Sequence, residues 1–206
     1  MIPAGHTVYA PSVNTAGKAT VALVRGPEGR LLWLSQPLPE FHGQMLPAGG
    51  VVCPLSSENA RALGGVFPWL SPHRLPDRPS FGFGDRLGLA TPGHVRACTR
   101  AHVFPVLAQQ SVRENARTGR TFEEVLTRAV FGAFEEGYQG GFGADADHIK
   151  DVNDALHAAD LGYTLFTCDP SDHTVAMGRL PPTEVANRFR SMPEAPAWRK
   201  DYLDRE

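Results

Sequence analysis

The most informative segment of the chain is Gly141-Phe-Gly-Ala-Asp-Ala-Asp-His-Ile-Lys150, in which a short apolar run ends in two aspartates and a histidine. A second segment, Phe166-Thr-Cys-Asp-Pro-Ser-Asp-His173, repeats this pattern. Parallel-sheet enzymes carry their catalytic groups at the C-terminal ends of strands, just before the next helix. Carboxylates and imidazole together can bind a divalent cation or transfer a proton. The two segments therefore predict one shared site.

Strands and helices alternate around these two segments. The predicted strands cover residues 80–86, 104–110, 141–148 and 163–168. Pro92 fits the first turn of a helix, where its missing N–H costs nothing. The clearest helix follows a capping box formed by Thr121 and Glu124 and carries apolar residues at 3.6-residue spacing. The predicted helix starts are Thr91, Thr121, Asp151 and Thr183, and the second and third helices are predicted to stop at Gly137 and Gly162.

Four such units in succession imply parallel strands with right-handed crossovers. Polar residues at all four strand ends favour a TIM-type (β/α)8 barrel, whose active site is formed by the ends of many strands. In an open sheet, the site lies at the one point where the strand order reverses. A full barrel needs about 250 residues, so residues 80–206 are expected to form its N-terminal half. Half a barrel exposes strand edges and its apolar inner face. We therefore expect a longer protein, or a second chain or copy that completes the ring.

Residues 1–79 are predicted to form a separate, small β-rich module. The segments 19–25 and 30–36 flank a Gly-Pro-Glu-Gly turn and predict a hairpin, and a short helix is expected at 57–63. This part shows no catalytic pattern, which is typical of a cap or a packing module.

Composition excludes several classes of protein. With 206 residues, 42% hydrophobic and 20% charged, the chain is long and apolar enough to be globular. A formal net charge of −2 gives no reason to expect nucleic acid or an anionic membrane as a partner. No signal peptide or membrane-spanning stretch is evident, and the three cysteines lack CxxC spacing. A cytoplasmic protein with reduced thiols is expected.

Five motifs together resemble the tagaturonate epimerase family of hexuronate catabolism. They are Ser80-Phe-Gly-Phe-Gly-Asp-Arg-Leu-Gly88, Thr91-Pro-Gly-His94, Ala108-Gln-Gln-Ser-Val-Arg113 with Arg117-Thr118, Gly141 to Lys150, and Phe166-Thr-x-Asp-Pro-x-Asp-His173. The resemblance covers roughly residues 80–175. It implies a metal-dependent barrel enzyme that interconverts tagaturonate and fructuronate. Family members are about twice this length, so further ligands and catalytic groups are expected outside this chain.

The resemblance also implies roles for individual residues. His148 is expected to bind a divalent metal cation, since neutral imidazole is a good ligand for such ions. Asp147, beside it, is expected to be the proton acceptor, and Asp145 is the second candidate catalytic carboxylate; which of the two is the base is left open. Their proximity on one strand face should make the pair titrate apart. Further candidates are His173 for the metal, and Arg86, Gln110, Arg113, Lys150 and Asp169 for the sugar-acid substrate.

The two sugar acids differ at a carbinol β to the ketone, a carbon whose C–H an enediol mechanism does not acidify. We therefore favour a retro-aldol route, in which a base removes the hydroxyl proton and a metal stabilises the enediolate. Three alternatives remain. A nicotinamide oxidoreductase is disfavoured because the glycines between Gly82 and Gly88 depart from GxGxxG. The others are another sugar-acid isomerase or aldolase on the same scaffold, and a non-catalytic half-barrel remnant.

Overall fold

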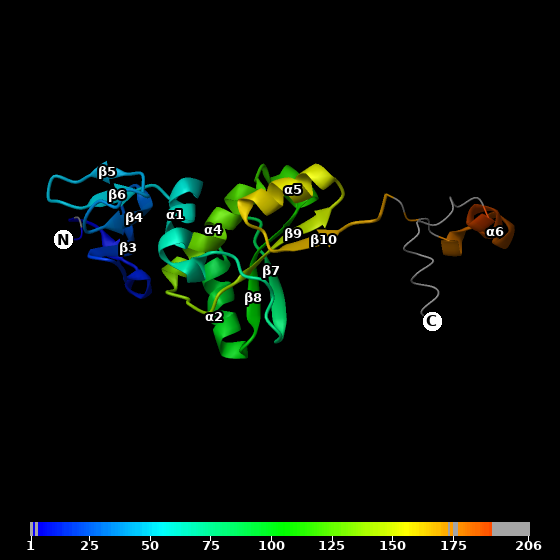
Figure 1. Ribbon diagram of the computed structural model, residues 1–206, viewed down its shortest axis with the longest axis horizontal. Coiled ribbons are helices and arrows are strands. Elements are labelled where there is room, and N and C mark those ends of the chain that lie inside the picture. The colour runs from blue at the N-terminus through cyan, green and yellow to red at the C-terminus, as the bar shows by residue number, and fades with distance from the viewer. Residues whose placement is uncertain (1, 3, 173, 175–176, 191–206) are drawn as a thin grey trace. The chain divides into compact units, whose positions relative to one another are not determined.

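The computed structural model describes residues 2, 4–172, 174 and 177–190. It divides into two compact units, Met1–Asp169 and Pro170–Glu206. The first unit contains two β-sheets and the helices that pack between and beside them (Figure 1). In the second unit, the described elements are the 3-10 turn η3 (Met177–Arg179) and helix α6 (Pro182–Arg190). Among the described residues, no helix combines the length and apolar character needed to cross a bilayer.

The first sheet is antiparallel and confirms a β-rich N-terminal part. Its central hairpin joins β3 and β4, with Gly26 paired to Gly29 across the turn, as the sequence predicts. β3 and β4 are apolar on both faces, so their side chains enter two separate clusters. The strands are β1 (Thr7–Val8), β2 (Asn14–Ala16), β3 (Ala19–Gly26), β4 (Gly29–Leu34), β5 (Gln44–Met45) and β6 (Val51–Cys53), with a 3-10 turn η1 at Ala10–Ser12.

Helix α1 (Ser57–Val66) confirms the helix expected at 57–63 and extends it by one turn. Ser56 caps it by accepting a hydrogen bond from the backbone N–H of Asn59 at 3.3 Å. A short 3-10 turn, η2 (Pro68–Leu70), follows and leads toward the second sheet.

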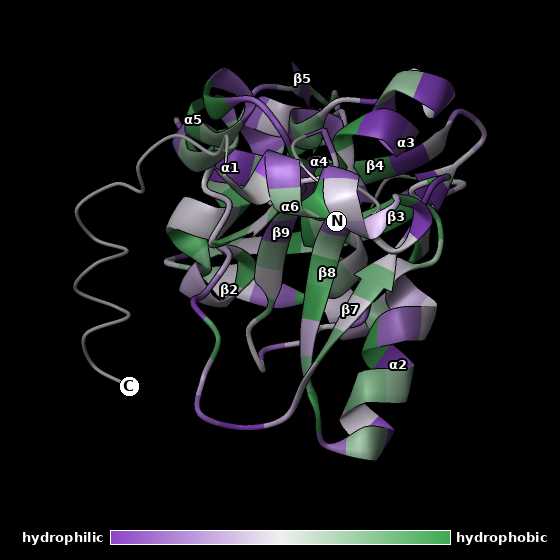
Figure 2. Cartoon of the chain, turned by 90° about the vertical axis from the view of Figure 1, so that its right-hand side faces the viewer, coloured by the Kyte–Doolittle hydropathy of each residue, from purple (hydrophilic) through white to green (hydrophobic). Residues whose placement is uncertain are grey.

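The second sheet has four strands, all parallel, in the order β10-β9-β8-β7. This confirms the predicted succession of parallel strands, each beside its neighbour in the sequence. Figure 2 shows β7, β8 and β9 side by side. The strands are β7 (Ser80–Gly84), β8 (Phe104–Ser111), β9 (Gly143–Ile149) and β10 (Leu165–Cys168). Each pair of neighbours contains one register shift.

The helices predicted to start at Thr91, Thr121 and Asp151 begin where the sequence signals place them. Thr121 accepts a hydrogen bond from the N–H of Glu124 at 3.1 Å, and Asp151 accepts one from the N–H of Asn153 at 2.6 Å. Gly162 ends the last of them in the left-handed conformation, with φ of 97°. The helices are α2 (Thr91–Ala101), α3 (Val112–Thr118), α4 (Phe122–Glu135) and α5 (Val152–Leu161).

Two features of the helices differ from the prediction. Helix α3 was not expected; Ser111 caps it by accepting from the N–H of Glu114 at 3.1 Å. The predicted cap at Thr183 is wrong, because α6 already begins at Pro182. The carbonyl of Pro181 accepts the first hydrogen bonds of that helix instead, and proline is well suited to its first turn.

The two faces of the parallel sheet differ in character. One face packs against α4 and neighbouring helices, and Leu107, Ala144 and Ala146 enter the core there. We call the opposite face the Asp145 face. Side chains of paired residues in neighbouring parallel strands point to the same side. By this pairing and by contact, the Asp145 face comprises Gly82, Val106, Gln109, Gly143, Asp145, Leu165 and Thr167.

One large hydrophobic cluster extends through the first unit. It contains Leu23 and Leu32 of the antiparallel sheet, Leu63 of α1, Phe134 of α4 and Ala146 of β9. Residues on both sides of position 79 thus share a core. The predicted domain boundary at residue 79 remains a prediction.

Candidate functional site

Asp145 lies at the centre of the Asp145 face and is the third residue of β9 (Gly143–Ile149), two residues before Asp147. Its side chain is buried, with only 7% of the residue exposed. Gln109 on β8 donates a hydrogen bond from Nε2 to Asp145 Oδ2 at 3.3 Å. From the other side, Thr167 on β10 donates its hydroxyl to the carboxylate, with Oγ1 lying 3.0 and 2.9 Å from the two oxygens. Three neighbouring strands therefore converge on one carboxylate.

The electrostatic environment of Asp145 favours its protonated form. Burial raises the pKa of this carboxyl group, because the charged form loses hydration. The hydrogen bonds from Thr167 and Gln109 oppose this effect, while the negative charge of Asp147 adds to it. The net direction is an upward shift. Buried carboxyl groups with raised pKa values are typical of catalytic sites.

Asp147 and His148 form a contact pair at the end of β9. Nδ1 of His148 lies 2.8 Å from Oδ1 of Asp147, and the His148 side chain is 47% exposed. His148 has a positive φ of 58°, which few residues other than glycine adopt. Such strained backbone is concentrated at functional sites. The pair resembles the carboxylate–histidine arrangement in which an acidic group orients an imidazole through Nδ1.

Lys150 and Asp169 meet just beyond the ends of β9 and β10. Nζ of Lys150 lies 3.8 Å from Oδ2 of Asp169. The backbone N–H of Asp169 donates to the carbonyl of Ile149 at 2.9 Å, which continues the pairing of the two strands. Both predicted residues therefore lie at the C-terminal edge of the sheet.

Arg86, Arg113 and Gln110 are not brought together with Asp145. Arg86 forms a hydrogen-bonded ion pair with Glu114, and the two line a cavity of about 190 Å³. Arg113 is exposed on α3. Gln110 is buried, and its ladder partner Ala146 lies in the core, so it belongs to the helix-covered side. His173 lies outside the described residues.

Asp85 organises the loop after β7. Its carboxylate accepts hydrogen bonds from the backbone N–H groups of Leu87 at 3.1 Å, Gly88 at 2.8 Å and Ala90 at 2.6 Å. Burial alone would raise the pKa of Asp85, but these backbone donors outweigh it and lower the pKa. Arg120 donates to the backbone carbonyl of the same residue. Asp85 therefore maintains the loop that carries Arg86.

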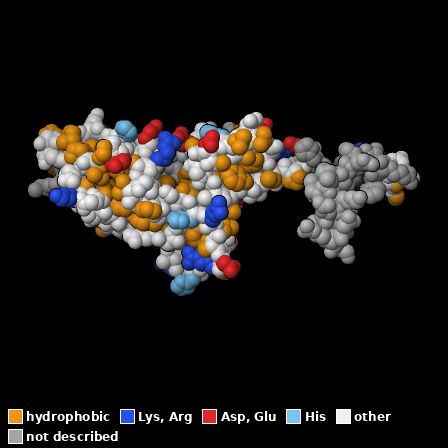
Figure 3. Space-filling view, viewed as in Figure 1, with side chains coloured by type: hydrophobic (Ala, Val, Ile, Leu, Met, Phe, Trp, Pro, Cys, Tyr) orange, Lys and Arg blue, Asp and Glu red, His pale blue; other side chains and the backbone are white. Residues whose placement is uncertain are grey.

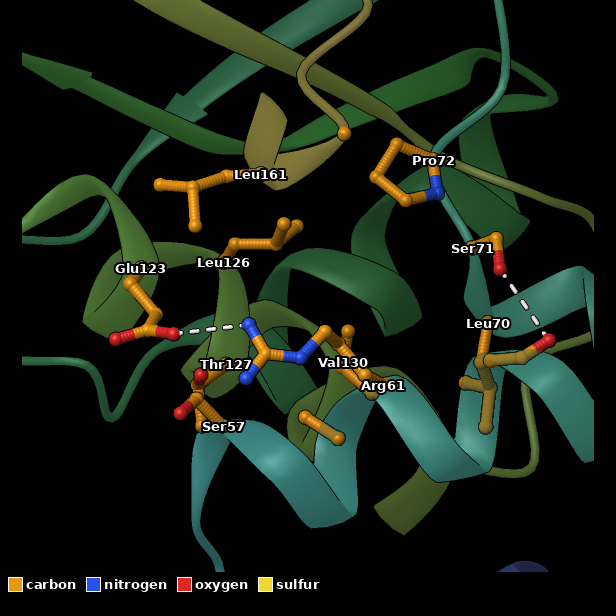
Figure 4. A pocket seen from close by; sticks show the side chains of 13 residues that line it. Ser57, Arg61, Leu70, Ser71, Pro72, Glu123, Leu126, Thr127, Val130 and Leu161 are labelled. Atoms are coloured by element: carbon orange, nitrogen blue, oxygen red, sulfur yellow. Dashed lines mark hydrogen bonds and ion pairs between the residues drawn. The ribbon is translucent and has the colours of Figure 1, made fainter. Parts of the chain in front are cut away.

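A cavity of about 250 Å³ lies away from these residues, between α1, α4 and the end of α5. Leu126 and Leu161 line it, and Arg61 contacts Glu123 at 3.0 Å beside it (Figure 4). None of the predicted site residues contributes to this cavity. It is structurally separate from the Asp145 face.

Sequence reasoning missed Gln109 and Thr167 as neighbours of Asp145. Strict alternation from Val106 along β8 points to Gln110, but the register of β8 against β9 shifts between Val106 and Ala108. Because side chains alternate, a shift of one residue reverses the face. Thr167 could have been found from strand alternation. It stands two positions after Leu165, so its side chain lies on the same face of the sheet as Leu165 and Asp145.

The described residues do not supply a group of three metal-donor side chains. Among them, no three His, Cys, Asp or Glu side chains converge on a point that could hold an ion. In the Asp147 and His148 pair, the carboxylate contacts Nδ1 of the imidazole. Nε2 points away from this contact and could serve as one metal ligand.

Comparisons with known proteins agree with one another. A family model described as UxaE, tagaturonate epimerase, matches residues 9–206. The tagaturonate/fructuronate epimerase of Thermotoga maritima is 43% identical over 209 residues, covering 98% of this chain and 42% of that relative. The native crystal structure of the fructuronate-tagaturonate epimerase UxaE from Cohnella laeviribosi has a TM-score of 0.86 at 33% identity, covering 98% of this chain and 42% of that one.

A glycerol complex of the same Cohnella laeviribosi enzyme matches with a TM-score of 0.85 and 33% identity, covering 97% of this chain and 41% of that one. The chain thus spans less than half the length of these relatives. The family model covers nearly all of it, with the motifs at the sheet edge included. The chain belongs to the tagaturonate epimerase family.

Proposed function

We propose that this chain carries the proton-transferring part of an epimerase that interconverts tagaturonate and fructuronate. The supporting observation is Asp145: a buried carboxyl group whose pKa is raised, held by two side chains from neighbouring strands. A raised pKa brings a general base closer to neutral pH, where proton transfer in both directions is efficient. The names of the relatives supply the substrate class.

We infer that the parallel sheet is one part of a (β/α)8 barrel. Its four strands follow one another in chain order, and their polar residues gather at the C-terminal ends, as in barrel enzymes. Exposed apolar side chains on α5 suggest that further chain covers this helix in the complete barrel. Val152 and Leu156 of α5 are 69% and 60% exposed, and Figure 3 shows hydrophobic side chains gathered over this helix. The remaining strands would come from further chain length or a second chain.

We assign the role of base to Asp145 and leave Asp147 to orient His148. In a retro-aldol route, Asp145 takes the proton of the hydroxyl at the carbon to be inverted. The neighbouring C–C bond then breaks, and its electron pair forms the enediolate of the ketone fragment. The aldehyde turns, the bond re-forms on its other face, and Asp145 returns the proton. No carbon-bound hydrogen at the inverted centre is exchanged, so deuterium from solvent should not appear there.

A divalent cation is a further component of the proposal. His148 would bind it through Nε2, with His173 or groups from additional chain as the other ligands. When bound, the cation would act as a Lewis acid on the substrate oxygen. The cation content of the purified chain and of His148→Ala, measured by mass spectrometry, tests this assignment.

Groups at the rim are proposed to bind the substrate. Lys150 offers an ammonium group to a carboxylate, and Asp169 can accept from a hydroxyl. Arg86 and Arg113 are guanidinium groups suited to bidentate carboxylate binding. Two buried free cysteines, Cys53 and Cys98, fit a reducing compartment, and we propose the cytoplasm.

The direct test is formation of fructuronate from tagaturonate by the chain and by Asp145→Asn. Loss of a general base lowers the rate by about 10²- to 10⁴-fold. Asp160→Asn is the matched control, because Asp160 is exposed on α5, and it should retain the wild-type rate. Equal rates for both variants would contradict the assignment of Asp145.

A second candidate is a non-catalytic half-barrel that binds the sugar acid without turnover. The chain spans 42% of the Thermotoga maritima relative. Binding of tagaturonate without conversion would support this candidate. Conversion of a different sugar acid would instead indicate another isomerase or aldolase.

A further inference from the structure

A row of four residues crosses the Asp145 face from one strand to the next. Gln109 on β8 pairs with Asp145 on β9, the hydroxyl of Thr167 on β10 reaches Asp145 from the other side, and the side chain of Gln109 lies over Gly82 of β7. The two neighbours of Asp145 both donate hydrogen bonds to its carboxylate, at 3.3 Å from Gln109 and at 2.9 and 3.0 Å from Thr167. The carboxylate is therefore fixed from both sides.

Gly82 allows Gln109 to lie in this row. A Cβ atom at Gly82 would lie 2.1 Å from Oε1 and 2.7 Å from Cδ of Gln109, well inside van der Waals contact. The amide side chain thus occupies the space that any other residue at position 82 would fill. The neighbouring Gly84 differs, because a Cβ atom there would meet only the backbone oxygen of Gln109, at 3.7 Å.

We propose that Gln109 and Thr167 are positioning residues for Asp145, and that Gly82 is needed because its missing side chain leaves room for Gln109. The inference concerns the ionisation and orientation of the carboxylate. Only its relevance to catalysis rests on the proposed function. Neither positioning residue needs to touch the substrate.

The expected consequence follows from the charges around Asp145. Burial and the neighbouring carboxylate of Asp147 raise its pKa, and the donors from Thr167 and Gln109 oppose them. Burial raises the pKa of Tyr163 and the charge of Asp145 adds to this effect; the Tyr163 hydroxyl donates to the carbonyl of Phe122 at 2.8 Å. Removal of either donor should therefore raise the pKa of Asp145 further. One hydrogen bond to a charged group corresponds to about one pKa unit or slightly more.

The test is an NMR titration of the Asp145 carboxyl carbon in the full chain, with the signal assigned through Asp145→Asn. Gly82→Ala and Thr167→Val should each raise the pKa by about one unit. The matched controls are Gly84→Ala, which meets no close neighbour, and Thr167→Ser, which keeps the hydroxyl. Both controls should titrate like the wild type. Amide spectra check that each variant is folded.

Unchanged titration of Asp145 in folded Gly82→Ala and Thr167→Val would overturn the inference, as would equal shifts in the controls. If Gly82→Ala does not fold, Thr167→Val against Thr167→Ser decides the question. The titration needs no turnover. Retained epimerase activity in Asp145→Asn would therefore reject Asp145 as the base while leaving the positioning result intact.

Discussion

The two sheets of the first unit use their faces in opposite ways. In the antiparallel sheet, Leu23 and Leu32 enter one hydrophobic cluster while Trp33 enters another on the opposite side. In the parallel sheet, the helix-covered face is mainly apolar, with Leu107, Ala144 and Ala146 in the core. The Asp145 face begins with apolar residues and becomes polar toward the C-terminal ends of the strands, where Gln109 meets Asp145.

This difference separates a structural sheet from a candidate catalytic one. A sheet that buries apolar side chains on both faces gains stability from burial but offers no reactive group. A buried carboxyl group costs stability unless hydrogen bonds compensate. Asp145 is retained at such a cost, with two donors beside it. The antiparallel sheet should therefore dominate stability, and the parallel sheet the chemistry.

The largest expected effect is loss of core packing in the antiparallel sheet. Leu32→Ala removes a fully buried side chain paired with Leu23 and should cost about 2–5 kcal/mol of unfolding free energy. Met45→Ala is the control, because Met45 is 62% exposed on the same sheet; it should cost less than about 0.5 kcal/mol. Urea unfolding measures both. Equal losses would remove the distinction between core and surface in this sheet.

A second experiment tests how α4, which covers the parallel sheet, meets the N-terminal part. Gly137 follows α4 with φ of 58°, and a Cβ atom there would lie 2.2 Å from the carbonyl oxygen of Pro11. Gly119 has a similar φ of 66° with nothing within 4 Å. Gly119→Ala should cost about 1–2 kcal/mol from the backbone alone. Gly137→Ala should cost at least about 1 kcal/mol more because of the clash. Equal costs in urea unfolding would argue against this close approach.

Two ion pairs, one largely buried and one exposed, should contribute smaller amounts to the unfolding free energy. Arg30 on β4 contacts Glu135 on α4 at 2.6 Å, with side chains 20% and 13% exposed. Arg61 and Glu123 lie 3.0 Å apart but are 59% and 42% exposed. Arg30→Ala should cost about 1–2 kcal/mol, and Arg61→Ala less than about 0.5 kcal/mol. Thermal unfolding in low and high salt would separate them, and a larger loss for Arg61→Ala would contradict the burial argument.

The smallest expected effects are opposite pH dependences at two carboxyl groups. The pKa of Asp85 is lowered in the folded chain, so its contribution to stability is present above the unfolded pKa and lost as pH falls through the folded pKa. The pKa of Asp145 is raised, so the folded state binds more protons and stability falls as pH rises from the unfolded to the folded pKa.

Consequently, Asp145→Asn should gain stability relative to the wild type as pH rises above 4 toward neutrality, roughly the range above the unfolded pKa of aspartate. Asp85→Asn should lose stability relative to the wild type as pH rises from the folded pKa of Asp85 to about 4, the unfolded pKa of aspartate, and the difference should stay constant above it. Urea unfolding at acidic and neutral pH measures both differences. The same sign for both variants would contradict the opposite environments of the two carboxyl groups.

Local signals in the sequence were sufficient for most elements of the fold. The caps at Thr121 and Asp151 and the hairpin turn at Gly26 depend on neighbouring residues only, and all three are confirmed. Helix α3 was missed because seven residues give too short a span for apolar periodicity to appear. The cap at Thr183 was displaced because Pro182 already fits a helical first turn.

The site was predictable in part. The clustering of Asp145, Asp147 and His148 follows from adjacency on one strand. The choice of Gln109 over Gln110 does not follow from adjacency, because it depends on a register shift between two strands, and Gln109 and Asp145 are 36 residues apart in the chain. The contact from Thr167 likewise requires β10 to pair with β9 in one register. Sequence alone does not fix such registers.

Binding of the sugar acid at the Asp145 face of the parallel sheet can be observed by titrating tagaturonate into the isotopically labelled chain and following the amide NMR shifts. We expect the largest shifts at Gln109, Asp145 and Thr167. Shifts confined to the cavity beside Arg61, or no shifts at saturating substrate, would contradict this expectation.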